Sequence, residues 1–169
     1  DVSEATADAL QALSFVRDNA STFGVDSSRL GVWGASAGGQ LALMLALAST
    51  GDSPPVRSAV VYMAPHSVEV TDPAMLELVP ALNMPAQTQR EVSPIYYVTP
   101  DAPPTLIVHG DQDAVVPIAS GEAMHAALSA ADVETDMIVL EGASHGFTGA
   151  DAEEALASSV RWFERHLGN

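Results

Sequence analysis

Residues 29–48 read RLGVWGASAGGQLALMLALA and join a short apolar run to a segment whose apolar residues have helical spacing. This order predicts a strand, a sharp turn and a helix, with Ser36 at the apex of the turn. A glycine-rich turn of this kind can also be a tight connection or a phosphate-binding loop. The flanking strand and helix favour catalysis, so Ser36 is the first candidate nucleophile.

The backbone of this turn is expected to be strained and crowded. We expect Gly34 and Gly38 to occupy positions where a Cβ would collide with the neighbouring strand or helix, and Gly39 to relieve the same crowding. The backbone N–H of Ala37, at the start of the helix, has no helical partner and is aligned with the helix dipole. It is therefore predicted to donate to a developing oxyanion, which makes one half of an oxyanion hole.

The composition is that of a globular protein with an extreme charge. The chain has 169 residues, 47% of them hydrophobic, and its 22 acidic residues against six basic ones give a net charge of -16. Such a chain repels phosphate, so neither nucleic acid nor an anionic membrane is expected as a partner. There is no cysteine for disulfides or thiolate metal sites. No apolar run reaches membrane-spanning length, and we expect a soluble protein, with the cytoplasm favoured over secretion.

Apolar runs alternate with helical patterns, which predicts a parallel α/β sheet with helices on both faces. Four strands are expected, at residues 30–33, 58–63, 105–108 and 136–140. Residues 64–99 hold five prolines and are expected to form an excursion over one face of the sheet. The last helix is expected to bury four apolar residues: Leu156, Val160, Phe163 and Leu167.

Ser36, Asp113 and His145 fall in separate loops that this topology places at the carboxyl ends of strands. A serine hydroxyl needs a base during attack, and a neutral imidazole suits that task near neutral pH. A carboxylate would fix the imidazole tautomer and stabilise the imidazolium that forms. Asp111 is the alternative acid, and His66 is a weaker candidate for a base or a pocket residue. The remaining histidines are interpreted as structural: His109, His125 and His166.

At this point the chain resembles the serine esterases of the α/β-hydrolase fold. It is similar to the acetyl-xylan and feruloyl esterase type, with kynurenine formamidase-like and hormone-sensitive-lipase-like relatives. The matching motifs are FVRDNA at 15–20, FGVD at 23–26, GASAGG at 34–39, SPI at 93–95, PP at 103–104, HGDQD at 109–113, VP at 116–117 and GASHGF at 142–147. By this resemblance Ser36 is the nucleophile, Asp113 the acid and His145 the base.

The sequence departs from the family pattern at its start. Members carry their first strands and an HGGG or HGGxW oxyanion loop before the helix with which this sequence opens, so the resemblance covers roughly the C-terminal three-fifths of a member. We expect the second oxyanion donor to be absent from residues 1–169. The strand at 30–33 should then present a bare apolar edge, to be paired with the missing N-terminal segment or a second chain.

These observations predict that residues 1–169 form a single α/β-hydrolase domain, the C-terminal portion of a serine carboxylesterase. The expected reaction is hydrolysis of small acyl esters, acetyl or aryl, through an acyl-enzyme. The expected partner is a small-molecule ester substrate, and neither cofactor nor metal is expected. A serine peptidase of the prolyl oligopeptidase type is the alternative enzyme, although its elbow usually carries an aromatic residue where this chain has Ala37. A non-catalytic, truncated hydrolase-fold module that only binds is the alternative of another class.

Overall fold

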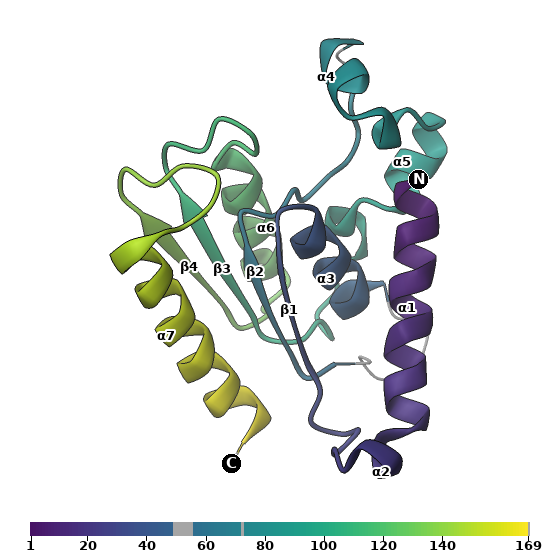
Figure 1. The fold of residues 1–169 in the computed structure, drawn as a ribbon, viewed down its shortest axis with the longest axis vertical. Coiled ribbons are helices and arrows are strands. Elements are labelled where there is room, and N and C mark those ends of the chain that lie inside the picture. Colours follow the sequence, from purple (N-terminus) through teal and green to yellow (C-terminus); the bar gives the residue numbers. More distant parts are fainter. Residues whose placement is uncertain (49–55, 72, 169) are drawn as a thin grey trace.

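The computed structural model describes residues 1–48, 56–71 and 73–168, and within them it contains one sheet of four parallel strands (Figure 1). The strands are β1 (Gly31–Ala35), β2 (Ser58–Tyr62), β3 (Thr105–Gly110) and β4 (Thr135–Leu140). They lie side by side in chain order, and every neighbouring pair is parallel. The four strands predicted from the sequence are therefore confirmed.

The two central strands are buried along their whole length, as expected for parallel strands with apolar residues on both faces. Val61 pairs with Ile107, and both belong to the core on one face of the sheet. Val60 pairs with Leu106, and both belong to the core on the opposite face. The outer strands β1 and β4 are only partly covered.

Helices cover both faces of this sheet (Figure 1). The main helices are α1 (Val2–Asp18), α3 (Ala37–Leu47), α6 (Ala119–Ala130) and α7 (Gly149–Leu167). α3 and α6 pack on one face and α7 on the other, while α1 packs on the outer side of α3. A capping box between Asp1 and Glu4 begins α1, and the one-turn helix α2 (Ala20–Phe23) follows it. None of the described helices combines the length and the apolar character needed to span a membrane.

The proline-rich excursion consists of short elements. They are α4 (Pro73–Leu78), η1 (Pro80–Leu82), α5 (Ala86–Glu91) and η2 (Pro94–Tyr97). The first part of the segment stands beyond the carboxyl end of β2, away from the sheet. Its last part, η2, contacts α3 and packs against the core on that face of the sheet, so the expected excursion over one face is confirmed for this end of the segment. Its centre is the buried Gln89, which accepts a hydrogen bond from the N–H of Val70 at 3.0 Å and donates one to the carbonyl of Leu82 at 3.0 Å.

The expectation for the last helix is wrong in part. Leu156 and Val160 are 64% and 47% exposed. The residues that α7 buries lie one or two positions before those of the predicted stripe, and three of the four have small side chains. They are Ala155, Ser158, Ser159 and Trp162. The reason is that α7 packs on β2 and β3 with a face that differs from the predicted stripe. Its other end reaches β1 at Gly31, where an added Cβ would lie 2.7 Å from Phe163 Cε1.

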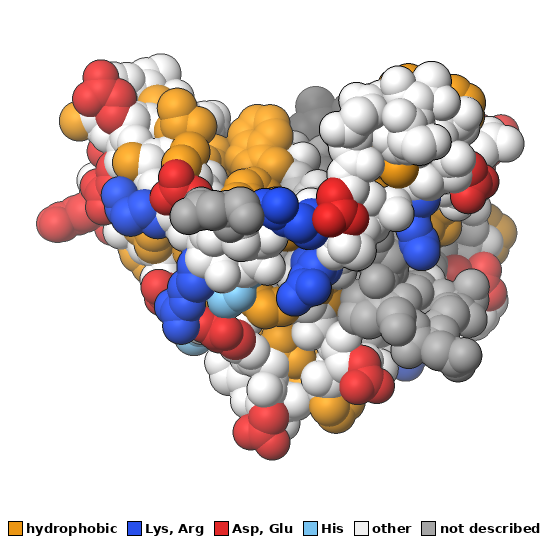
Figure 2. Space-filling model, turned by 90° about the horizontal axis from the view of Figure 1, so that it is seen from below, with side chains coloured by type: hydrophobic (Ala, Val, Ile, Leu, Met, Phe, Trp, Pro, Cys, Tyr) orange, Lys and Arg blue, Asp and Glu red, His pale blue; other side chains and the backbone are white. Residues whose placement is uncertain are grey.

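An apolar surface therefore remains open along β1. Trp33 on this strand is 56% exposed and meets Tyr62 edge-on, with 5.3 Å between the ring centroids. Together with Leu156 and Val160 it forms what we call the β1-edge patch. Figure 2 shows a notch between the flank formed by α7 and the flank formed by α1, with hydrophobic side chains at its floor. The bare apolar edge expected from the sequence is present among the described residues.

Candidate active site

Ser36 occupies a strained turn between β1 and α3. Its backbone has φ 53° and ψ −125°, in the region that residues with a Cβ rarely adopt. The turn is held by a hydrogen bond from the Ser36 N–H to the carbonyl of Tyr62 at 2.9 Å. A Cβ on Gly34 would lie 2.1 Å from the carbonyl oxygen of Gly38, so only glycine fits at position 34.

The prediction of crowding at Gly38 is wrong. An added Cβ there meets no described atom within 4 Å, because this position faces away from the sheet. The second point of close approach is Gly39, where a Cβ would lie 2.7 Å from the Cβ of Ala64. Gly34 and Gly39 thus let the helix pack against the strands.

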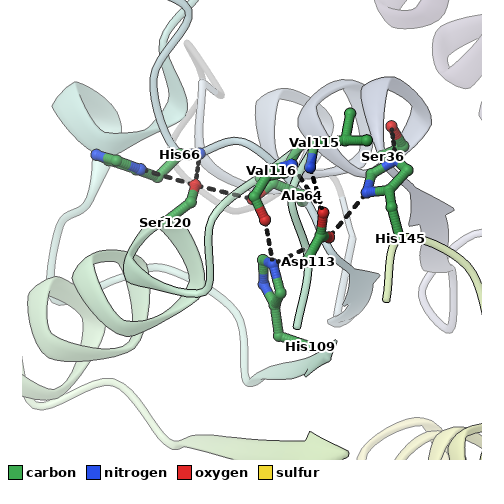
Figure 3. A network of polar contacts seen from close by, with 9 residues as sticks. All are labelled: Ser36, Ala64, His66, His109, Asp113, Val115, Val116, Ser120 and His145. Carbon is green, nitrogen blue, oxygen red and sulfur yellow. Dashed lines mark hydrogen bonds and ion pairs between the residues drawn. The ribbon is translucent and has the colours of Figure 1, made fainter. Parts of the chain in front are cut away.

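Ser36, His145 and Asp113 form one hydrogen-bonded chain at the carboxyl end of the sheet (Figure 3). Ser36 Oγ lies 2.9 Å from His145 Nε2, and His145 Nδ1 lies 2.8 Å from Asp113 Oδ2. An ionised carboxylate only accepts hydrogen bonds, so Nδ1 carries the proton and Nε2 is left to accept from the serine hydroxyl. The Asp113 side chain is fully buried, whereas that of His145 is 23% exposed and borders solvent.

The Asp113 carboxylate is supported by its own loop. Its Oδ1 accepts hydrogen bonds from the N–H groups of Val115 at 2.8 Å and Val116 at 2.9 Å. Burial acts to raise the pKa of this carboxyl, but hydrogen bonds from His145, Val116 and Val115 and the charge of His145 outweigh it. The net result is a pKa below the ordinary aspartate value, so Asp113 is ionised at neutral pH.

Asp111 has a different partner. Its Oδ1 accepts the N–H of Gly142 at 2.7 Å, and its own N–H donates to the carbonyl of Leu140. The N–H of Gln112 donates to Ala143 O at 2.9 Å, and a Cβ on Gly110 would lie 2.2 Å from the same oxygen. Asp111 therefore belongs to a tight backbone junction between the loops after β3 and β4, while Asp113 contacts His145.

Ala37, the predicted oxyanion donor, is the first residue of α3, where a backbone N–H has no partner inside the helix.

His66, the weaker candidate for a base, lies apart from the triad. Its Nδ1 is 2.8 Å from Ser120 Oγ, and Figure 3 shows its ring directed away from Ser36 and His145. Burial lowers the pKa of His66 below the ordinary histidine value. The hydrogen-bonded chain does not include it.

The sequence reasoning missed the carboxylate cradle made by the amides of Val115 and Val116. It also missed a contact between Asp113 and His109, whose Nε2 lies 3.5 Å from Asp113 Oδ2. An aspartate at the start of a turn often accepts hydrogen bonds from backbone N–H groups two or three residues later, so Asp113 itself was the signal for this cradle. No such signal distinguishes His109, which reads as an ordinary strand residue. Among the described residues no group of three or more potential ligands is placed to hold a metal ion.

This arrangement has the parts needed to activate a hydroxyl. His145 can remove the Ser36 proton, Asp113 is placed to stabilise the resulting imidazolium, and the N-terminus of α3 offers a donor beside the serine. Together these groups place a serine hydroxyl at the carboxyl end of the sheet, next to solvent. Such a hydroxyl is suited to attack an electrophilic acyl or phosphoryl centre.

Several known proteins are similar in sequence to this chain. Esterase LipQ of Mycobacterium tuberculosis is 29% identical over 173 residues, which cover 91% of this chain and 39% of that protein. The acylamino-acid-releasing enzyme of Rattus norvegicus is 27% identical over 161 residues, 85% of this chain and 21% of that protein. The chain therefore spans two-fifths or less of these two relatives.

Solved structures of Thermogutta terrifontis esterase 2 have the same fold. The form phosphoramylated by tabun is 25% identical, with a TM-score of 0.81, and the match covers 99% of this chain and 66% of that one. The propionate-bound form is 26% identical, with a TM-score of 0.80 and the same coverage. In addition, residues 4–169 match the Prolyl oligopeptidase family. The chain has the α/β-hydrolase fold and belongs to the prolyl oligopeptidase family.

Proposed function

We propose that this chain is the catalytic C-terminal portion of a serine carboxylesterase that hydrolyses small acyl esters, acetyl or aryl, through an acyl-enzyme. Ser36 is the nucleophile, His145 the base and Asp113 the acid. The observation that carries this proposal is the unbroken chain from Ser36 Oγ through both nitrogens of His145 to Asp113 Oδ2, with contacts of 2.9 and 2.8 Å.

The reaction follows from these contacts. Ser36 Oγ attacks the ester carbonyl carbon while His145 Nε2 takes the hydroxyl proton, and Asp113 stabilises the imidazolium. The carbonyl oxygen becomes an oxyanion that accepts the N–H of Ala37. His145 then gives its proton to the leaving alcohol, and the C–O bond of the ester breaks. A water molecule, deprotonated by the same imidazole, then attacks the acyl carbon. The bond from this carbon to Ser36 Oγ breaks, His145 returns the proton to Oγ, and the carboxylic acid leaves.

The known relatives support the choice of esters. LipQ is named an esterase, and the solved relative is described as an esterase with propionate bound in one form and phosphoramylated by tabun in another. A short carboxylate and an organophosphorus agent are consistent with a small acyl site next to a reactive serine.

A serine peptidase is the second candidate. Two observations favour it: the family match is to prolyl oligopeptidase, and one relative is named an acylamino-acid-releasing enzyme. Comparing turnover of p-nitrophenyl acetate with that of an N-acetylamino acid p-nitroanilide separates the two functions. We expect the ester to be preferred by far, and a preference for the anilide would favour the peptidase.

We also propose an occupant for the β1-edge patch: a strand that precedes residue 1 in the natural polypeptide and carries the second oxyanion donor. The open strand β1, the exposed Trp33, Leu156 and Val160, and the 66% coverage of the solved esterase support this assignment. A strand paired with β1 would lie beside Ser36. It would therefore be placed to aim a second N–H at the oxyanion.

Labelling by a fluorophosphonate tests the proposed function. The natural polypeptide that carries these residues should be labelled at Ser36, because organophosphorus reagents form a bond to an activated serine Oγ and expel fluoride. Peptide mass mapping locates the adduct. The Ser36→Ala variant is the control. Labelling that persists undiminished in this variant would show that the nucleophile is elsewhere.

A further inference from the structure

A second imidazole lies beside the Asp113 carboxylate. His109, near the end of β3, is fully buried, and its Nε2 lies 2.9 Å from the carbonyl oxygen of Val116 and 3.5 Å from Asp113 Oδ2 (Figure 3). The proposed reaction leaves this group without a role. Burying a polar side chain costs free energy unless hydrogen bonds compensate for the lost water. The contacts of the buried His109 ring are therefore informative.

The contacts of the ring define its tautomer. A carbonyl oxygen only accepts, so Nε2 must carry the hydrogen that points toward Val116. Nδ1 is buried and has no hydrogen-bond partner in the described part of the chain. On that side α6 comes close, and a Cβ on Gly121 would lie 2.8 Å from Nδ1. Helix α6 thus leaves just enough room for the ring.

The hydrogen bond from His109 closes the loop that holds the carboxylate. Val116 donates its N–H to Asp113 Oδ1, while its carbonyl accepts the His109 N–H. Val115 donates to the same carboxylate oxygen. Oδ2 is thereby left to face His145 Nδ1 at 2.8 Å. One buried ring therefore anchors the peptide that sets the direction of the carboxylate.

We propose that His109 is a positioning residue for Asp113, which acts by anchoring the Val116 carbonyl so that the loop amides hold the carboxylate toward His145. This inference rests on the proposed function, because positioning matters only if Asp113 supports His145 during the reaction. Loss of the anchor lowers the rate of the chemical step and leaves substrate binding unchanged.

Two substitutions of His109 test the proposal in the natural polypeptide. His109→Leu removes the N–H donor, and we expect kcat for p-nitrophenyl acetate to fall about 10- to 100-fold, by analogy with the loss of groups that orient a metal ligand. KM should change by less than about twofold, because uniform binding is untouched. His109→Gln places an amide N–H near the position of Nε2 and should restore kcat to within about threefold of the wild type.

A double-mutant cycle separates positioning from general stability. In an Asp113→Asn background His109→Leu should have no further effect on kcat, because groups that act as a unit are not additive. Leu128→Ala is the matched control, because it truncates a fully buried side chain on α6. This variant should have a lower Tm and an unchanged kcat. If His109→Leu does not fold, Gly121→Ala displaces the ring from the opposite side and should reproduce the fall in kcat.

The outcomes are distinguishable. An unchanged kcat in His109→Leu, or an equal loss in both Asp113 backgrounds, would overturn the positioning role while leaving the esterase assignment intact. Undiminished turnover in Ser36→Ala would overturn the esterase assignment and this inference with it. A loss of kcat that His109→Gln rescues and Asp113→Asn abolishes supports the proposal.

Discussion

Two carboxylates at the end of β3 face different partners. Asp113 contacts the His145 ring, and Asp111 accepts the Gly142 amide. The two residues stand two positions apart in the chain and both follow the same strand. The direction of each side chain therefore determines which of the two carboxylates contacts His145. Because their partners differ, each carboxylate can be tested separately.

Replacing Asp113 by Asn should lower turnover of p-nitrophenyl acetate by about 10⁴-fold, because an amide no longer fixes the tautomer of His145. Asp111→Asn should cost far less, about tenfold or below, because it disturbs a backbone junction rather than the hydrogen-bonded chain. Steady-state kinetics on both variants gives the ranking. The reverse ranking would assign the acid to Asp111.

The lowered pKa of Asp113 makes stability depend on pH. A carboxyl whose pKa is lower in the folded state contributes stability that is present above its unfolded pKa of about 4 and is lost as the pH falls through the folded value. The difference in Tm between the wild type and Asp113→Asn should therefore narrow as the pH falls below about 4. Differential scanning calorimetry from pH 7 downward measures it. A difference that stays constant with pH would contradict the shifted pKa.

At the scale of the elements, the turn before α3 depends on close backbone packing. Gly34→Ala would place a Cβ 2.1 Å from the Gly38 carbonyl oxygen. Because that atom belongs to the backbone it cannot move aside, and we expect a loss of at least about 3 kcal/mol in the free energy of unfolding. Gly38→Ala is the matched control and should be neutral or stabilising by up to about 1 kcal/mol, since helical glycine is entropically costly. Urea titrations compare the two; an equal loss in both would argue against this account.

The strands could be predicted from the sequence, and the rotation of α7 could not. Continuous apolar runs identify β2 and β3 because both faces of these strands are buried. On α7 the apolar stripe through Leu156 and the buried face through Ala155 differ by one position. Small residues such as Ser159, which meets Tyr62 Oη at 2.6 Å, allow close approach to the sheet without any hydrophobic signal. Which face is covered depends on what lies beside β1, and residues far away in the chain decide that.

For the candidate site, the serine, the histidine and both aspartates were identifiable because each follows a predicted strand. The role of His109 was not identifiable, since it depends on a carbonyl seven residues away. A strand-end histidine looks the same in sequence whether its ring contacts a helix or a carboxylate. Only the three-dimensional course of the loop from Asp113 to Val116 separates the two cases.

At the scale of the whole molecule, we expect the open β1 edge to limit catalysis by the 169-residue polypeptide in isolation. Ala37 is the one oxyanion donor that we propose among the described residues, and the loss of a single donor typically costs about 10²–10³ in turnover. The β1-edge patch should also self-associate. Sedimentation velocity and acetyl-ester turnover of this polypeptide test both consequences together. A monomer with ordinary esterase turnover would show that these residues already contain a second donor.

Substitution of the patch provides the control for that experiment. Leu156→Ser with Val160→Ser replaces two exposed apolar side chains of α7 by polar ones. Self-association should weaken while the low turnover of the isolated polypeptide stays the same. Association that is unchanged by the double substitution would place the contact elsewhere.

The strands of this sheet are adjacent in the order in which the chain is written, and that order has a consequence for biosynthesis. A polypeptide leaves the ribosome from its N-terminus, so each new strand meets the edge of a sheet that already exists. The serine emerges first, directly after β1, the aspartate follows β3, and the histidine comes only after β4. In a nascent chain the proposed nucleophile therefore has no histidine partner until translation has passed residue 145. We expect a ribosome-bound chain to hydrolyse esters only after the loop that carries His145 can reach Ser36.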